Sequence, residues 1–178
     1  MEEFIKDWGY IALFLYSFGG GFLGLAVASV VAYSGDLNIY ICVLVAGISN
    51  FIGSQFLFFL ARKNKNYAKD MMKKYGRKIA LTHLLMQRYG SFIIFIQKYI
   101  YGIKTVIPLA MGITKYSAVK FSVFNAMATT LWACVIGYLS FIAGEYLLAL
   151  GEEFKYIGLG IVVLIIAIIS FVFRKNQR

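Results

Sequence analysis

Two lysines inside one long apolar stretch are the residues of this chain with the most distinctive chemistry. The stretch 89–112 is mostly apolar, yet it carries Lys98 and Lys104 near its middle. A lysine at the centre of a bilayer costs about 2.5–3.5 kcal/mol on insertion scales, so a helix with two of them would face lipid poorly. Two ammonium groups that face a wet cavity can instead bind an anionic group such as a phosphate. The pattern therefore predicts an anion-binding site.

The backbone of the same stretch also departs from an ordinary membrane helix. It contains Gly102, Gly112 and Pro108, the only proline of the chain. Irregular backbone at membrane depth is tolerated only where protein or water satisfies its polar groups. We therefore expect 89–112 to form a re-entrant hairpin. The alternative is an ordinary spanning helix whose two lysines extend to one membrane surface.

The composition places the chain among integral membrane proteins. Of its 178 residues, 61% are hydrophobic and the mean hydropathy is +0.75, whereas soluble domains are about 45–50% apolar. We expect a single membrane domain over 1–178. The net charge of +10 could indicate nucleic-acid binding, but the basic residues lie between apolar segments and build no separate polar face. We therefore expect no nucleic acid partner.

The first apolar segment, 9–34, is interrupted by a glycine run. Gly19, Gly20 and Gly21 follow one another, and Gly24 comes shortly after them. Each glycine inside a helix costs about 1 kcal/mol relative to alanine, so the run favours a turn or a close backbone approach to a ligand. Close helix packing through small residues is the alternative. We expect a second re-entrant hairpin here.

Three further segments are long and apolar enough to cross a bilayer, which takes about 20 residues. They are 39–61, 121–144 and 156–173. The segment 39–61 has polar residues at its centre that an anchoring helix would not need: Ser49, Asn50, Ser54 and Gln55. Such groups either bond to neighbouring helices or line a cavity. We assign Ser49 to helix packing and leave the other three open.

The distribution of lysine and arginine predicts which side each segment faces. The segment 62–88 is rich in both and has Asp70 as its one acidic residue, so we place it in the cytoplasm. The basic C-terminus is placed there too, whereas the glutamates of 145–155 mark the outside. The helix 121–144 then starts inside. The stretch 89–112 consequently begins and ends on the cytoplasmic side, which favours the hairpin.

The chain then consists of two halves of opposite orientation. Each half is a hairpin followed by a helix, 9–61 and 89–144, with one added helix at the end. Asn50 and Asn125 occupy similar places in the two helices. Inverted repeats whose interrupted segments meet near the midplane are typical of secondary transporters. The predicted fold is thus an all-α membrane protein with two oppositely oriented re-entrant hairpins and about three transmembrane helices.

Several of these residues together resemble the DedA family of bacterial membrane proteins, also called the SNARE-associated or VTT domain group. The resemblance is carried first by one run and the helix after it: Lys98, Gly102, Lys104, Thr105, Pro108, Gly112, then Phe121, Asn125 and Trp132. A second element is Gly53, Phe58 and Arg62. The resemblance implies two facing re-entrant hairpins, an inner-membrane location, and movement of undecaprenyl phosphate or phospholipid between leaflets.

The chain departs from the family pattern at its charged positions. Lys98 and Lys104 stand where the family usually has arginines, so the charge is kept but bidentate phosphate binding is not. Ser54 stands where the family has an aspartate, and neither hairpin contains a carboxylate. The resemblance therefore does not carry over proton coupling through buried acids.

These features predict a lipid transporter, flippase or scramblase for an anionic, phosphate-headed lipid. The predicted substrate-binding residues are Lys98, Lys104, Thr105, Pro108, Gly102, Gly112, Gly19, Gly20, Gly21, Asn50, Ser54, Gln55 and Asn125. An ion- or proton-coupled small-solute transporter or channel that uses the same cavity is the alternative. A structural or assembly protein would instead tolerate neutral replacement of the lysines.

We expect no enzymatic activity. Nucleophilic catalysis needs a nucleophile beside a base, and neither hairpin contains His, Asp, Glu or Cys. His83 is the only histidine and lies in the basic segment, so no metal or cofactor is expected. Cys42 and Cys134 lie in apolar runs, and we predict that they are packing residues. Membrane lipids are the expected partners, and the oligomeric state stays open.

Overall fold

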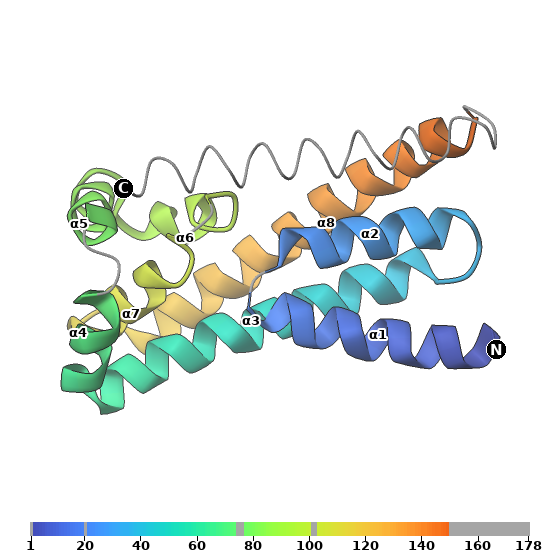
Figure 1. The fold of residues 1–178 in the computed structure, drawn as a ribbon. Coiled ribbons are helices and arrows are strands. Elements are labelled where there is room, and N and C mark those ends of the chain that lie inside the picture. The colour runs from blue at the N-terminus through green and yellow to red at the C-terminus, as the bar shows by residue number, and fades with distance from the viewer. Residues whose placement is uncertain (1, 20, 74–76, 101–102, 150–178) are drawn as a thin grey trace.

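The regular elements of the described chain are all helical, as predicted (Figure 1). The computed structural model describes residues 2–19, 21–73, 77–100 and 103–149. The elements are α1 (Glu2–Phe18), α2 (Phe22–Tyr33), α3 (Ile39–Lys63), α4 (Lys65–Lys73), α5 (Arg77–Tyr89), the 3₁₀ helix η1 (Gly90–Phe92), α6 (Ile93–Ile96), α7 (Val106–Ile113) and α8 (Ala118–Ala149). The predicted segment 156–173 and the basic C-terminus lie outside the described residues.

Two helices, α3 and α8, are long and apolar enough to cross a bilayer. The candidate spans are Ile39–Lys63, with a mean hydropathy of 1.8, and Ala118–Tyr146, with 1.7. Only 33% of the most apolar part of each is buried within the protein. A core helix of a soluble protein would be mostly buried, whereas Leu44 on α3 and Leu131 on α8 are among many exposed apolar side chains. Length, composition and exposed apolar faces together fit a membrane protein.

The N-terminal segment forms a helical hairpin, α1–α2, that breaks at the predicted glycine run. Gly21 has an extended backbone and precedes α2, and its N–H donates to the carbonyl of Tyr16 at 3.3 Å. A Cβ at Gly21 would lie 2.1 Å from the Tyr16 ring, so the turn requires a glycine. The first helix begins earlier than the predicted segment, which started at residue 9. It starts at Glu2, because acidic residues favour a helix N-terminus.

The turn between α2 and α3 follows the predicted sequence signal. Gly35 has a φ of +93°, a value that glycine adopts without strain. Asn38 then begins α3, because its side-chain oxygen accepts hydrogen bonds from the backbone N–H groups of Tyr40 and Ile41. Such a cap satisfies donors that a helix N-terminus leaves unpaired.

The stretch 89–112 is not one continuous helix. It contains η1 and the single turn α6, leaves helical geometry after Ile96, and resumes as α7 at Val106. The backbone of this stretch is therefore irregular, as its glycines, proline and lysines predicted. Figure 1 shows α5, α6 and α7 at one end of the long helices and the α1–α2 hairpin at the other.

The arms of the two interrupted segments, α1–α2 and α6–α7, pack on the long helices α3 and α8 in a reciprocal pattern. The first arm of each interrupted segment packs on the long helix that follows it in the chain, α1 on α3 and α6 on α8. The second arm packs on the long helix of the other half, α2 on α8 and α7 on α3. The long helices α3 and α8 also pack on each other. Both halves of the chain therefore contribute to each end of the protein.

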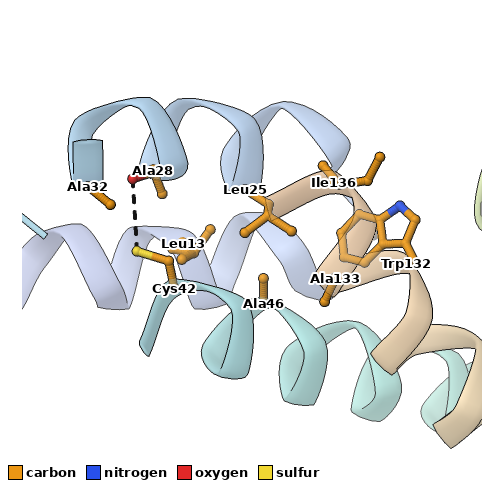
Figure 2. Packing of buried hydrophobic residues seen from close by; sticks show 9 residues of the cluster. All are labelled: Leu13, Leu25, Ala28, Ala32, Cys42, Ala46, Trp132, Ala133 and Ile136. Carbon is orange, nitrogen blue, oxygen red and sulfur yellow. Dashed lines mark hydrogen bonds between the residues drawn. The ribbon is translucent and has the colours of Figure 1, made fainter. Parts of the chain in front are cut away.

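One hydrophobic core joins α1, α2, α3 and α8 (Figure 2). Leu25 and Ala46 pack in it with Trp132. Cys42 is buried there, and its thiol contacts the carbonyl of Ala28 at 3.9 Å, as expected for a packing residue. The same prediction is wrong for Cys134, which is exposed, because α8 turns that side away from the other helices.

A second core, at the opposite end, holds α3, α7 and α8 together. Phe58 and Phe121 stack with their ring centroids 4.2 Å apart. Arg62 donates hydrogen bonds to the carbonyls of Thr114, at 3.2 Å, and Tyr116, which follow α7. Its guanidinium also lies 4.8 Å from the centre of the Phe58 ring. Arg62 thus fixes the turn between α7 and α8.

Candidate functional site

A cavity of about 230 Å³ lies where the two interrupted segments meet α3. The α1–α2 hairpin contributes its tip, α3 contributes one face, and the irregular stretch between α6 and α7 contributes the rest. The lining residues are Phe18, Gly19, Asn50, Gly53, Ser54, Phe56, Leu57, Gln97, Lys98, Lys104 and Thr105. Residues far apart in the sequence thus form one site.

Lys98 is held by two polar side chains of α3. Its ammonium group donates to Oδ1 of Asn50 at 2.7 Å and to Oγ of Ser54 at 3.0 Å. Asn50 and Ser54 are four residues apart, so they share one face of the helix. A lysine ammonium has three N–H donors, and these two bonds use two of them. The arrangement orients a cation in the cavity and leaves a donor for a further acceptor.

Lys104 brings a second positive charge to the same cavity. Lys98 and Lys104 are both partly buried, and both line it. Thr105, next to Lys104, also lines the cavity and precedes α7. Among the described residues, no acidic side chain contributes to the lining. The two lysines give the cavity a positive character, which favours an anionic ligand.

The close approach of the α1–α2 hairpin to α3 depends on Gly53. A Cβ on Gly53 would lie 2.1 Å from the carbonyl oxygen of Phe18, so only glycine allows the end of α1 to come this close. Phe18 itself, with Phe56 and Leu57 of α3, gives the cavity an apolar part. Phe18 and Phe56 are also exposed, so the apolar part of the cavity reaches the protein surface.

The predicted site residues divide into those that line the cavity and those that pack around it. Six of the predicted residues line it: Lys98, Lys104, Thr105, Gly19, Asn50 and Ser54. Gly20 and Gly102 lie outside the described residues. Gly21 packs against Tyr16, and a Cβ at Gly112 would lie 2.3 Å from the carbonyl oxygen of Phe58. Pro108 is buried in the first turn of α7, where its missing N–H leaves no helix bond unmade.

Two other predicted polar residues also lie away from the lining. Asn125 is buried on α8, and its amide nitrogen donates to the carbonyl of Phe51 at 3.2 Å. Gln55 is partly buried on α3. Ser49, which we assigned to helix packing, donates to the carbonyl of Phe14 on α1. Helix contacts thus account for Ser49 and for the amide nitrogen of Asn125, whose Oδ1 is buried without a partner among the described residues.

The sequence reasoning missed one polar residue of the cavity, Gln97. It lines the cavity beside Lys98, and its side chain is 1% exposed. A glutamine directly before a lysine in a run of isoleucine and phenylalanine was the available signal. The apolar residues Phe18, Phe56 and Leu57 were missed too, because nothing distinguishes them from the apolar residues around them.

Comparison with known proteins places the chain in a family. The family model of the VTT domain matches residues 5–142. Undecaprenyl phosphate transporter A of Staphylococcus aureus is 24% identical over 197 aligned positions, which cover 100% of this chain and 97% of that protein. Inner membrane protein YohD of Escherichia coli is 23% identical over 145 positions, covering 82% of this chain and 76% of that protein.

A further relative is the uncharacterized membrane protein YbfM of Bacillus subtilis. It is 25% identical over 150 positions, which cover 76% of this chain and 90% of that protein. No solved structure matches the chain. The matched region contains most of α1 and α8, all of the other helices, and every described residue that lines the cavity. The chain therefore belongs to the VTT domain family, also known as the DedA family, of membrane proteins.

Proposed function

We propose that this protein moves an anionic, phosphate-headed lipid between the two leaflets of the bacterial inner membrane. The lipid is undecaprenyl phosphate or a phospholipid. Membership of the family and the name of the S. aureus relative support transport of a lipid carrier. The observation that carries the proposal is the position of Lys98, held by Asn50 and Ser54 in the same cavity as Lys104.

In this proposal both interrupted segments are re-entrant and enter the membrane from opposite faces. The segment 62–88 and the C-terminus face the cytoplasm, and the two halves are an inverted repeat. The reciprocal packing supports the repeat, since α1 packs on α3 as α6 packs on α8, and α2 packs on α8 as α7 packs on α3. Hairpin tips that meet at one cavity are what such a repeat produces.

The size of the cavity indicates which part of the lipid enters it. Pockets that enclose a drug-sized ligand have volumes of about 300–1,000 Å³, and this cavity has about 230 Å³. It therefore accommodates a head group and not a whole lipid. The phosphate binds the ammonium groups of Lys98 and Lys104, while the acyl or prenyl chain stays among exposed apolar side chains such as Phe18 and Phe56.

The charge of the cavity lowers the cost of moving a head group through the membrane. A phosphate in hydrocarbon loses its hydration and has no counter-charge. The two lysines supply that charge, and the fixed position of Lys98 means that little reorganisation is needed when the phosphate arrives. The described lining contains no carboxylate, so the proposal includes no proton transfer through an acidic side chain.

The test is lipid translocation in proteoliposomes with neutral variants of the two lysines. The purified protein is reconstituted with fluorescent phospholipid or polyprenyl phosphate, and the exchange between leaflets is measured. Hydrogen bonds to charged groups contribute about 1.5–3 kcal/mol, so Lys98→Gln should slow exchange by at least about tenfold. Lys104→Gln should slow it similarly. Lys115→Gln is the matched control, because Lys115 is exposed and does not line the cavity.

The same measurement separates the proposal from its rivals. Exchange at the wild-type rate in both Lys98→Gln and Lys104→Gln would refute the role of the cavity. Flux of ions or small solutes without lipid exchange would favour the channel or solute-transporter alternative. A pH gradient imposed across the vesicle membrane shows whether exchange is coupled to protons.

A further inference from the structure

Gln97 has a buried side-chain amide that no described residue hydrogen-bonds. Its side chain is 1% exposed, and neither its carbonyl oxygen Oε1 nor its nitrogen Nε2 has a hydrogen-bond partner among the described residues. Roughly 90% or more of buried polar groups in proteins have a partner. The residue lines the same cavity as the two lysines. The occupant of that cavity is therefore in a position to be the partner of the amide.

The other polar groups of the cavity define what Gln97 adds. The ammonium groups of Lys98 and Lys104 are donors only. The side-chain oxygens of Asn50 and Ser54 already accept hydrogen bonds from Lys98. Oε1 of Gln97 is thus a buried acceptor that no described protein group occupies. An anion alone satisfies the donors of the cavity and leaves this acceptor without a hydrogen bond.

We propose that Gln97 recognises a hydrogen-bond donor on the lipid head group, next to the phosphate that the lysines bind. Its NH₂ group donates to a phosphate oxygen, and its Oε1 accepts from a hydroxyl of the head group or from a protonated phosphate oxygen. This inference rests on the proposed lipid transport. The substrate class becomes narrower: an anionic phosphate that also carries an O–H group. A phosphodiester with an alkyl group in place of the hydroxyl leaves Oε1 unpaired.

Such a site discriminates between lipids that carry a head-group hydroxyl and lipids that lack one. A site built to hydrogen-bond a hydroxyl rejects an analogue that lacks it, because a buried polar group is then left unpaired. Gln97 is therefore a specificity residue, and Lys98 and Lys104 supply the affinity for charge. Replacing Gln97 should therefore change the ratio of the exchange rates of the hydroxyl-bearing lipid and its analogue, chiefly through the rate of the hydroxyl-bearing lipid.

The experiment compares two matched pairs of lipids in proteoliposomes that contain the full-length protein. The first pair is phosphatidylglycerol and phosphatidylmethanol, which are both singly charged phosphodiesters and differ in the head-group hydroxyls. The second pair is polyprenyl phosphate and its methyl ester, compared at about pH 5, where the monoester is mostly singly charged like the ester. The two arms distinguish a glycerophospholipid from a polyprenyl source. We expect the wild-type protein to exchange the hydroxyl-bearing lipid of at least one pair about tenfold faster or more.

Variants of Gln97 test whether its side-chain amide causes the preference for the hydroxyl-bearing lipid. Gln97→Met keeps the length of the side chain and removes both hydrogen-bonding groups, so the ratio should fall to near one. Gln97→Asn keeps an amide at a shorter reach and should give an intermediate ratio. Ser17→Ala is the control, because Ser17 Oγ is also buried without a partner among the described residues but does not line the cavity. It should keep the wild-type ratio.

Each outcome bears on a different claim. Equal rates within both pairs in the wild-type protein, or an unchanged ratio in Gln97→Met, overturn the role of Gln97 and leave transport intact. Failure of the wild-type protein to exchange any of the four lipids overturns the transport function and this inference with it. If Ser17→Ala also loses the difference in exchange rate between the two lipids of a pair, general packing sets the preference for the hydroxyl-bearing lipid. That result also overturns the inference.

Discussion

A methyl group added at Gly53 tests whether the cavity depends on contact between the α1–α2 hairpin and α3. In Gly53→Ala the new Cβ would lie 2.1 Å from the carbonyl oxygen of Phe18 and 3.1 Å from its carbonyl carbon. Both are backbone atoms, so no side-chain rotation relieves the overlap. The end of α1 must move by about 1 Å before the contact becomes tolerable. Phe18 and Gly19, which line the cavity, would move with it.

Two opposing effects determine how Gly53→Ala changes the free energy of unfolding. Overpacking of this kind costs about 1–3 kcal/mol, whereas alanine in place of glycine favours a helix by about 0.5–1 kcal/mol. We therefore expect a net loss of about 0–2.5 kcal/mol in the free energy of unfolding, centred near about 1 kcal/mol. Lipid exchange should also fall, because the hairpin tip no longer closes on the cavity as it does in the wild-type protein.

The matched control for this prediction lies on the same helix. A Cβ at Gly47 would lie 3.5 Å from the Cβ of Ala133, an ordinary contact. Gly47→Ala therefore gains the same helix preference without the overlap, and its stability should equal or exceed that of the wild-type protein. Thermal unfolding in detergent and lipid exchange in proteoliposomes measure both variants. If Gly53→Ala is as stable and as active as Gly47→Ala, the need for close approach at Gly53 is refuted.

Two more predictions concern the turn after α7 and the side of the membrane on which the chain emerges. Arg62→Gln removes hydrogen bonds to the carbonyls of Thr114 and Tyr116 and should lower the unfolding free energy by about 1.5–3 kcal/mol. Denaturant unfolding measures it, with exposed Lys63→Gln as the control, and equal stability of the two variants would contradict it. Cysteines placed at Arg88 and Lys115 should react with an impermeant reagent from one face, and a cysteine at Asp36 from the other. Labelling of Arg88→Cys and Lys115→Cys from opposite faces would eliminate the re-entrant hairpin.

Much of the helix layout could be predicted because length and composition determine it. The predicted segments 39–61 and 121–144 correspond to α3 (Ile39–Lys63) and to the middle of α8 (Ala118–Ala149). The ends differ because a helix continues through polar residues that an apolar run excludes. The interruption within 89–112 was also predictable, since glycine, proline and two lysines all disfavour a continuous lipid-facing helix.

The direction in which each polar residue points was harder to predict. The helices α3 and α8 are apolar on nearly every side, so no polar stripe identifies the face that borders the cavity. Asn50 and Ser54 share a face because they are one turn apart, whereas Gln55 is rotated by about 100° from Ser54. Asn125 resembles Asn50 in sequence position, yet it bonds to the backbone of α3. Such differences arise from tertiary packing, which spacing alone does not show.

Because the second arm of each half packs on the long helix of the other, we expect that neither half folds on its own. A fragment ending at α4 would lose α8, whose Trp132 shares a core with Leu25 and Ala46. The same reciprocal packing also has a consequence for motion. Because α2 packs on α8 and α7 packs on α3, we expect a shift of either long helix to carry with it an arm of the interrupted segment from the other half. We therefore expect a displacement at the tip of one interrupted segment to move the tip of the other.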